Sequence, residues 1–111
     1  MAALLGTFEQ IVLIAVKTLD DQAYGRAILR GVQLSLERTR TVTAGSVYAT
    51  LDRLEAEGLL NSRLEKGAEK RKGRARRYYQ LTPHGVTALS DARRTLERAW
   101  RAIDWPAGVQ G

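Results

Sequence analysis

A basic segment in the second half of the chain sets the strongest limit on its fold and its partners. Residues 63–77 hold eight basic residues against two acidic ones, and the other ten basic and ten acidic residues cancel, so this segment carries the whole net charge of +6. A positive surplus confined to one segment is typical of a contact with a polyanion. A solvated basic loop without a partner is the alternative.

Two stretches with the residue types of β-strands, residues 60–66 and 76–81, overlap the two ends of the basic segment. Gly67 and Gly73 are turn residues in the sequence GAEKRKGRA that separates the two stretches. In the second stretch Tyr78 and Tyr79 fall on opposite faces, because successive side chains of a strand alternate. The pattern predicts a β-hairpin with a long cationic tip, in which one of the two tyrosines belongs to the core.

Helical spacing of hydrophobic residues dominates the first part of the chain. The first expected helix covers residues 4–19 and is apolar almost all round, so we expect it to be buried on more than one side, one of which can belong to a second subunit. Residues 40–42 predict a short strand. A second helix is expected over residues 21–36, with these residues on its buried side: Tyr24, Ala27, Ile28 and Leu34.

A third helix is expected between Thr43 and Gly58. Thr43 has the hydroxyl of an N-cap residue, and Gly58 suits the position just after a helix end. Val47, Leu51 and Leu54 recur at the spacing of one inward face.

A fourth helix is expected to open at Thr82, the N-cap, with Pro83 as its first helical residue. Leu89, Leu96 and Ile103 recur in it at intervals of seven residues. This spacing predicts either a seam for a partner helix or an ordinary stripe that faces the core.

The composition argues against several classes of function. The chain has no cysteine, so it has no disulfide and no thiolate metal site. Its single histidine, His84, has no second histidine with which to share a metal ion, and we expect it at the surface. With no Gly-rich phosphate loop after a strand and no carboxylate pair in an apolar surrounding, neither an enzyme nor a cofactor is expected. The absence of a long apolar run and of a signal peptide predicts a cytoplasmic protein.

The expected order of elements is two helices, a short strand, a third helix, a basic hairpin and a last helix. A helix-turn-helix followed by a β-hairpin is a winged helix, so the fold class is α+β, mainly α, with a two-stranded basic wing. The expected units are a winged-helix DNA-binding domain over residues 1–82, a dimerisation helix over residues 83–105 in the same compact unit, and a tail over residues 106–111.

Four stretches of the sequence follow one another in chain order: LGTFEQIVLIAV, AYGRAI, TAGSVYATLDRLEAEGLL and RRYYQLTPHG. They lie within residues 5–89 and resemble the PadR family of bacterial transcriptional regulators, specifically its shorter members with a single C-terminal helix. The resemblance implies a homodimer whose interface is formed by the first and last helices. It also implies a repressor of transcription that binds an inverted-repeat operator in double-stranded DNA and that, in many members, is released by a small aromatic or cationic compound.

The resemblance and the charge distribution together imply roles for individual residues. DNA contacts are expected from the start of the third helix and from the wing, at Thr43, Ser46, Tyr48, Arg53, Lys66, Lys70, Arg71, Lys72, Arg74 and Arg76. The dimer interface is expected to contain Phe8, Ile11, Leu89, Leu96, Trp100 and Ile103. Because some family members stack ligands on a tryptophan of the last helix, Trp100 is also the candidate effector-binding residue.

Simpler structural roles compete with these assignments. Ser46 could satisfy an amide at the helix start, Tyr48 could pack beside Leu51, and Trp100 could belong to the core or the interface alone. Arg53 could pair with an acid of its own helix, Asp52 or Glu57. Two other functions also compete. An RNA-binding basic domain would have only two tyrosines near the wing for base stacking, and the basic charge of the wing argues against a winged helix that binds only proteins.

Overall fold

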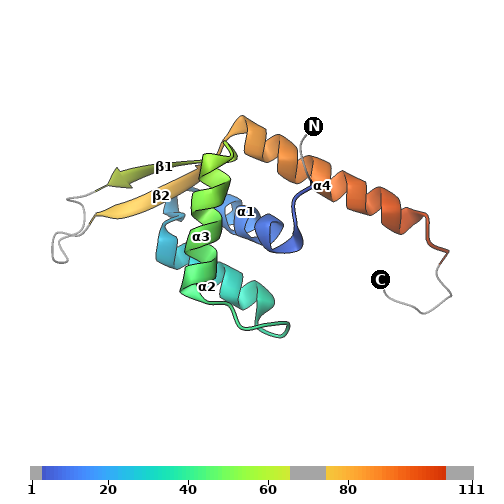
Figure 1. Cartoon of the computed structure of the whole chain (residues 1–111), viewed down its shortest axis with the longest axis horizontal. Coiled ribbons are helices and arrows are strands. Elements are labelled where there is room, and N and C mark those ends of the chain that lie inside the picture. Colours follow the sequence, from blue (N-terminus) through green and yellow to red (C-terminus); the bar gives the residue numbers. More distant parts are fainter. Residues whose placement is uncertain (1–3, 66–74, 105–111) are drawn as a thin grey trace.

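Three helices enclose the hydrophobic core, and a two-stranded hairpin and a long last helix extend from it in opposite directions (Figure 1). The computed structural model describes residues 4–65 and 75–104. The elements are α1 Thr7–Leu19, the short 3-10 helix η1 Asp20–Gln22, α2 Gly25–Leu36, α3 Ala44–Ala56, β1 Leu60–Glu65, β2 Arg76–Leu81 and α4 Pro83–Arg101. The order of α2, α3 and the antiparallel β1–β2 hairpin is that of a winged helix, which confirms the predicted fold class.

The core takes side chains from the three helices and from both strands of the hairpin. Tyr79 is the buried tyrosine of β2, 8% exposed, whereas Tyr78 is half-buried, as strand alternation requires. Leu34 was expected in the core and is instead 54% exposed, because the buried positions of α2 recur every fourth residue from Ile28. The largest fully buried side chains are Val12, Leu13, Val16, Ile28, Val32, Val47, Leu51, Leu54 and Leu60.

The local signals for the ends of helices are confirmed. Thr43 caps α3, and Gly58, just past its end, has a φ of +81°, which glycine adopts without the steric penalty of a Cβ. Thr82 caps α4 through a hydrogen bond from the amide of Gly85 to its hydroxyl at 2.9 Å, and Pro83 is the first helical residue. These positions fix where α3 and α4 begin and where the hairpin starts.

The short strand predicted for residues 40–42 is wrong, since these residues, all within the described part of the chain, form no strand. Val42 is 6% exposed, and its carbonyl oxygen accepts a hydrogen bond from the side-chain amide of Gln33 at 3.2 Å. Its β-branched side chain therefore fills the core without pairing in a sheet. The residue that bridges to the hairpin is Tyr24, which pairs with Tyr78.

Helices α1 and α2 begin later than hydrophobic spacing predicted. The first begins at Thr7 rather than at residue 4, with Gly6 as its N-cap. The second begins at Gly25 rather than at residue 21. The amide of Tyr79 donates to the carbonyl oxygen of Ala23 at 2.9 Å. Because Ala23 pairs with β2 in this way, the residues before Gly25 do not join the helix.

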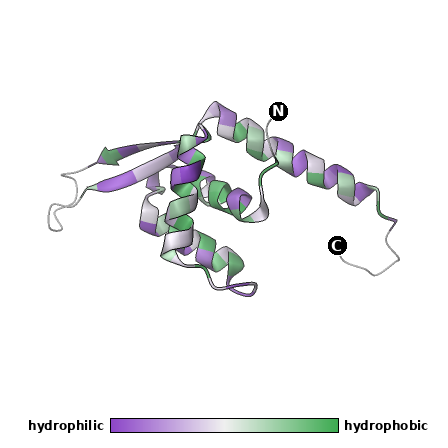
Figure 2. Ribbon diagram, in the orientation of Figure 1, coloured by the Kyte–Doolittle hydropathy of each residue, from purple (hydrophilic) through white to green (hydrophobic). Residues whose placement is uncertain are grey.

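The second half of α4 projects away from the core (Figure 1). Gly85 and Ala92 are its buried residues, whereas Leu96 and Trp100 are 54% and 44% exposed. Hydrophobic and hydrophilic residues are interspersed along this helix (Figure 2), and the exposure of Leu96 and Trp100 means that part of its apolar surface faces water. Among the described helices, none is long and apolar enough to cross a membrane. The predicted tail, residues 106–111, lies outside the described residues.

Candidate nucleic-acid interface

One side of α3 is turned away from the core along its whole length. The buried side consists of Val47, Thr50, Leu51 and Leu54. Most of the outer side chains are small, so only a few of them can make polar contacts with a partner. The exposed positions are Ala44, Gly45, Tyr48, Ala49, Asp52, Arg53 and Ala56.

Two hydrogen bonds, both donated by Ser46 and accepted by Thr43, form the start of α3. The amide of Ser46 donates to the Oγ1 of Thr43 at 3.1 Å, and the hydroxyl of Ser46 donates to the carbonyl oxygen of Thr43 at 2.8 Å. Each hydroxyl group can both donate and accept, so the Thr43 hydroxyl can still donate to a partner and the Ser46 oxygen can still accept. The two residues therefore stabilise the start of the helix and can still make a polar contact with a partner.

Tyr48 lies at the surface between α2 and α3. A Cβ atom added to Gly25 would lie 3.4 Å from the Cε1 atom of the Tyr48 ring, so the ring rests against the first residue of α2. The side chain remains 39% exposed. Tyr48 therefore contacts the neighbouring helix and also presents part of its surface to a partner.

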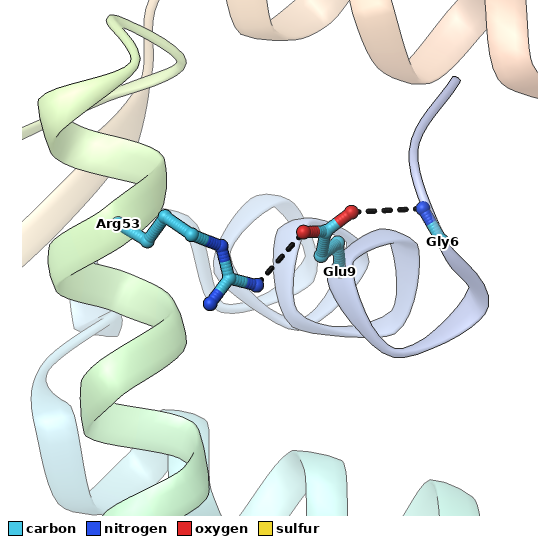
Figure 3. A network of polar contacts seen from close by, with 3 residues as sticks. All are labelled: Gly6, Glu9 and Arg53. Carbon is cyan, nitrogen blue, oxygen red and sulfur yellow. Dashed lines mark hydrogen bonds and ion pairs between the residues drawn. The ribbon is translucent and has the colours of Figure 1, made fainter. Parts of the chain in front are cut away.

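Arg53 pairs with an acid of α1 and not with an acid of its own helix (Figure 3). Its Nη2 atom donates to the Oε2 atom of Glu9 at 2.8 Å, and the Oε1 atom of Glu9 accepts from the amide of Gly6 at 2.8 Å. The hydrogen bond from Gly6 and then the Arg53 guanidinium hold the pKa of the Glu9 carboxyl below its usual value. Glu9 was not among the predicted site residues, although it is the one acidic residue of α1.

The base of the wing is joined to the N-cap residue of α2 by four side chains in contact, two tyrosines with an arginine on either side. The Cζ atom of Arg76 lies 4.1 Å from the ring centroid of Tyr24, and the Cζ atom of Arg63 lies 5.3 Å from that of Tyr78. The two tyrosine rings meet edge to face with centroids 5.7 Å apart. Cation–π and edge-to-face contacts of this kind orient both guanidinium groups at the wing base.

The opposite face of the wing is joined to α3. Nη1 of Arg77 donates to the Oγ atom of Ser62 at 2.9 Å, and the Ser62 hydroxyl donates to Oε2 of Glu55 at 2.7 Å. The wing base is therefore attached to both helices of the helix-turn-helix.

Five predicted DNA-contacting residues lie outside the described residues: Lys66, Lys70, Arg71, Lys72 and Arg74.

A groove of about 590 Å³ runs between α1 and α4. Three of the six predicted interface residues line it, namely Leu89, Leu96 and Trp100. Of the others, Ile103 is 47% exposed, and Phe8 and Ile11 are half-buried against the core. The remaining lining residues are Gln10, Ile14, Lys17, Leu81, Val86, Ser90, Arg93 and Glu97.

His84 is exposed in the first turn of α4, where it was expected. Within residues 4–65 and 75–104, no three side chains of the His, Asp or Glu type gather in a way that could hold a metal ion.

Helix-turn-helix, wing and long last helix together define a winged-helix protein. Residues 13–91 match the family described as Transcriptional regulator PadR-like family. The Transcriptional regulator Rv3488 of Mycobacterium tuberculosis is 44% identical over 80 residues, which cover 68% of this chain and 69% of the relative. This chain therefore belongs to the PadR family of transcriptional regulators, and the family indicates a regulator rather than an enzyme.

Solved structures agree with this fold. A PadR family transcription regulator from Clostridium difficile R20291 is 26% identical, with a TM-score of 0.64 over 87% of this chain and 94% of that chain. A transcriptional regulator from Clostridium thermocellum is 21% identical, with a TM-score of 0.68 over 86% of this chain and 85% of that chain. The predicted resemblance to the PadR family is confirmed.

Proposed function

We propose that this protein is a homodimeric repressor that binds an inverted-repeat operator in double-stranded DNA, and that a small aromatic or cationic compound releases it. The observation that carries the proposal is the exposed side of α3 beside the base of a wing that holds the whole positive surplus of the chain. In this proposal residues 1–82 bind DNA and residues 83–105 form the dimer.

The distribution of charge indicates which of the two elements, α3 or the wing, contributes affinity for DNA and which contributes sequence recognition. Helix α3 contains one basic residue, Arg53, and two acidic ones, Asp52 and Glu55. Phosphate contacts supply affinity that does not depend on sequence, whereas contacts with base edges in the major groove specify the site. We therefore assign most of the affinity to the wing and the recognition of sequence to α3, from Thr43 and Ser46 onward.

The test is selection of bound duplexes from a random DNA pool at about physiological salt, where binding to phosphates alone is suppressed. Enrichment of an inverted repeat whose half-sites lie about 34 Å apart, one turn of the duplex, would support a dimeric regulator with a defined operator. Binding without enrichment, or equal binding to an RNA of matched length, would contradict the proposal.

The dimer is supported by the exposed apolar side of α4. Ile14 and Val86 are 49% and 47% exposed in the groove between α1 and α4, beside the exposed Leu96 and Trp100. Burial of apolar surface of this kind in a second subunit is favourable by about 25 cal/mol for each Å² removed from water. The α4 helix of a second copy is the occupant that the family resemblance implies.

Replacement of Leu96 with aspartate tests the dimer, because it places a carboxylate in the apolar contact. We expect Leu96→Asp to sediment as a monomer at concentrations at which the wild type is a dimer. Thr87→Asp is the matched control, since Thr87 is exposed on α4 and does not line the groove. A Leu96→Asp protein that sediments like this control would contradict the assigned interface.

The effector site is proposed at Trp100, which lines the same groove. An aromatic cation can stack on the indole ring. We expect ethidium, added without DNA, to bind the wild type and to bind Trp100→Ala at least tenfold more weakly, as measured by calorimetry. Equal binding by the two proteins would assign Trp100 to the interface alone.

A further inference from the structure

We propose that Glu9 is a specificity-determining positioning residue for DNA recognition: it directs the guanidinium group of Arg53 toward base edges and cancels the charge that would attract it to phosphates. The inference rests on the proposed DNA-binding function. It adds to that function a residue of α1, outside the recognition helix and the wing.

Arg53 is the one cationic hydrogen-bond donor on the outer side of α3, where the phenol of Tyr48 is the other exposed group that can donate. Gly45, Ala49 and Ala56 on that side have no polar side-chain atoms, and Asp52 can only accept hydrogen bonds when it is ionised. The side chain of Arg53 is 48% exposed, so a partner can reach it. The direction in which Arg53 points therefore decides where α3 can offer guanidinium donors to a base.

Glu9 fixes that direction with both of its carboxylate oxygens. One oxygen accepts from Gly6 at the start of α1, which holds the carboxylate in place, and the other accepts from Nη2 of Arg53. A guanidinium group has five N–H donors in one plane. The bond to Glu9 uses one of them and fixes the plane of the others, which remain able to donate to a base. Fixing this plane before DNA arrives lowers the entropic cost of binding.

The ion pair also separates two kinds of DNA contact. Attraction to phosphates depends on net positive charge, which Glu9 neutralises, whereas recognition of a guanine edge depends on the direction of two donors. The pairing therefore favours base contacts by Arg53 over phosphate contacts. The basic wing remains the part of the chain that supplies charge.

The first variant is Glu9→Gln, because it replaces one of the two carboxylate oxygens, which accept separately from Gly6 and Arg53, with an NH2 group that can only donate. We expect its dissociation constant for the duplex selected from the random pool to rise about tenfold, the usual scale of one base contact. For a scrambled duplex of equal length we expect binding that is no weaker than that of the wild type. The released cation should steepen the salt dependence by up to about 0.9 in log–log slope.

The second variant is Arg53→Lys, which keeps the positive charge beside Glu9 but lacks the planar set of donors. We expect it to lower the ratio of selected to scrambled affinity by about tenfold with unchanged binding to the scrambled duplex. A purely structural ion pair would tolerate this exchange. If thermal melting shows that Glu9→Gln does not fold, Arg53→Lys alone tests whether the direction of the guanidinium donors sets the ratio of selected to scrambled affinity.

Asp91→Asn is the matched control, since it removes one negative charge and breaks the exposed pair between Asp91 and Arg94 on α4, away from α3. We expect it to keep the wild-type ratio. The inference is overturned if Glu9→Gln and Arg53→Lys keep this ratio too, or if they lose affinity equally for both duplexes. Failure of the proposed function would be visible in the wild type itself, as equal binding to both duplexes, and would remove the basis of the inference.

Discussion

Replacement of Gly85 with alanine would place a Cβ atom closer to its neighbours than at any other described glycine. The added Cβ atom would lie 2.1 Å from the carbonyl oxygen of Leu59 and 3.1 Å from its carbonyl carbon. Both are backbone atoms, so no side chain can move aside. The same carbonyl oxygen accepts from the amide of Thr82 at 3.1 Å, and the Thr82 hydroxyl donates to the carbonyl of Gly58 at 2.7 Å. Helix α4 would have to move away from the turn that precedes β1.

The expected cost follows from these contacts. Overpacking of this kind costs about 1–3 kcal/mol, and each of the two hydrogen bonds from Thr82 contributes about 0.5–1.5 kcal/mol. The higher helix propensity of alanine offsets about 1 kcal/mol. We expect Gly85→Ala to lower the free energy of unfolding by about 3 kcal/mol, which corresponds to a Tm lower by about 10–20 °C in a domain of this size.

Urea and thermal unfolding followed by circular dichroism measure this loss, at one fixed protein concentration because association of subunits adds to the apparent stability. Gly45→Ala is the matched control, since Gly45 also lies in the first turn of a helix and has no atom within 4 Å of an added Cβ. We expect this control to be as stable as the wild type or more stable by up to about 1 kcal/mol. If Gly85→Ala unfolds at the same temperature as the control, the close approach of α4 to Leu59 is refuted.

Three further predictions concern the wing and the two groups with shifted pKa values. Alanine at Lys70, Arg71, Lys72 and Arg74 together should weaken binding to all duplexes and reduce the salt slope by up to about 0.9 per lost phosphate contact, and an unchanged slope would contradict the assignment of the wing. Because the pKa of Glu9 is lowered in the folded state, the stability that it contributes is present above about pH 4.5 and is lost as the pH falls below this value. Urea unfolding should therefore show wild type more stable than Glu9→Gln by about 0.3–1 kcal/mol at pH 7 and by less at pH 3; a gap that does not change would count against the ion pair. Burial, with a smaller effect of the Asp52 carboxylate, raises the pKa of the Tyr79 phenol, so the folded state resists its ionisation and loses stability as the pH rises above about 10. Tyr79→Phe should lack this part of the alkaline loss while Tyr48→Phe keeps it, which unfolding at pH 9 and pH 11 would reveal.

Features encoded by neighbouring residues could be predicted from the sequence. The cap at Thr43, the helix end at Gly58 and the start of α4 at Thr82 and Pro83 each depend on residues within one helical turn. The hairpin also follows from local alternation, which placed Tyr78 and Tyr79 on opposite faces. These signals were sufficient for the winged-helix fold, because its elements follow one another with short connections.

Features that depend on distant residues could not be predicted in this way. The partner of Arg53 is Glu9, 44 positions away, and the sequence offered nearer acids as alternatives. The start of α2 is set by pairing of Ala23 with β2, which overrides the helical spacing of the preceding residues. The exposure of Leu34 has the same origin, since the face of α2 that is buried depends on where α1 and α3 pack.

The placement of α3 depends on both helices that form the groove. In α1, Phe8 lies under the guanidinium of Arg40, which precedes α3, at 4.7 Å, and Glu9 holds Arg53 near the other end of the helix. In α4, the first turn rests against Leu59, just after α3 ends. A ligand or a second subunit that changes the distance between α1 and α4 would therefore act on α3 from both of its ends. The wing base would follow, because Ser62 bonds to Glu55 of α3. The proposed release of DNA by a compound in the groove therefore requires no contact between that compound and the proposed DNA-binding surface.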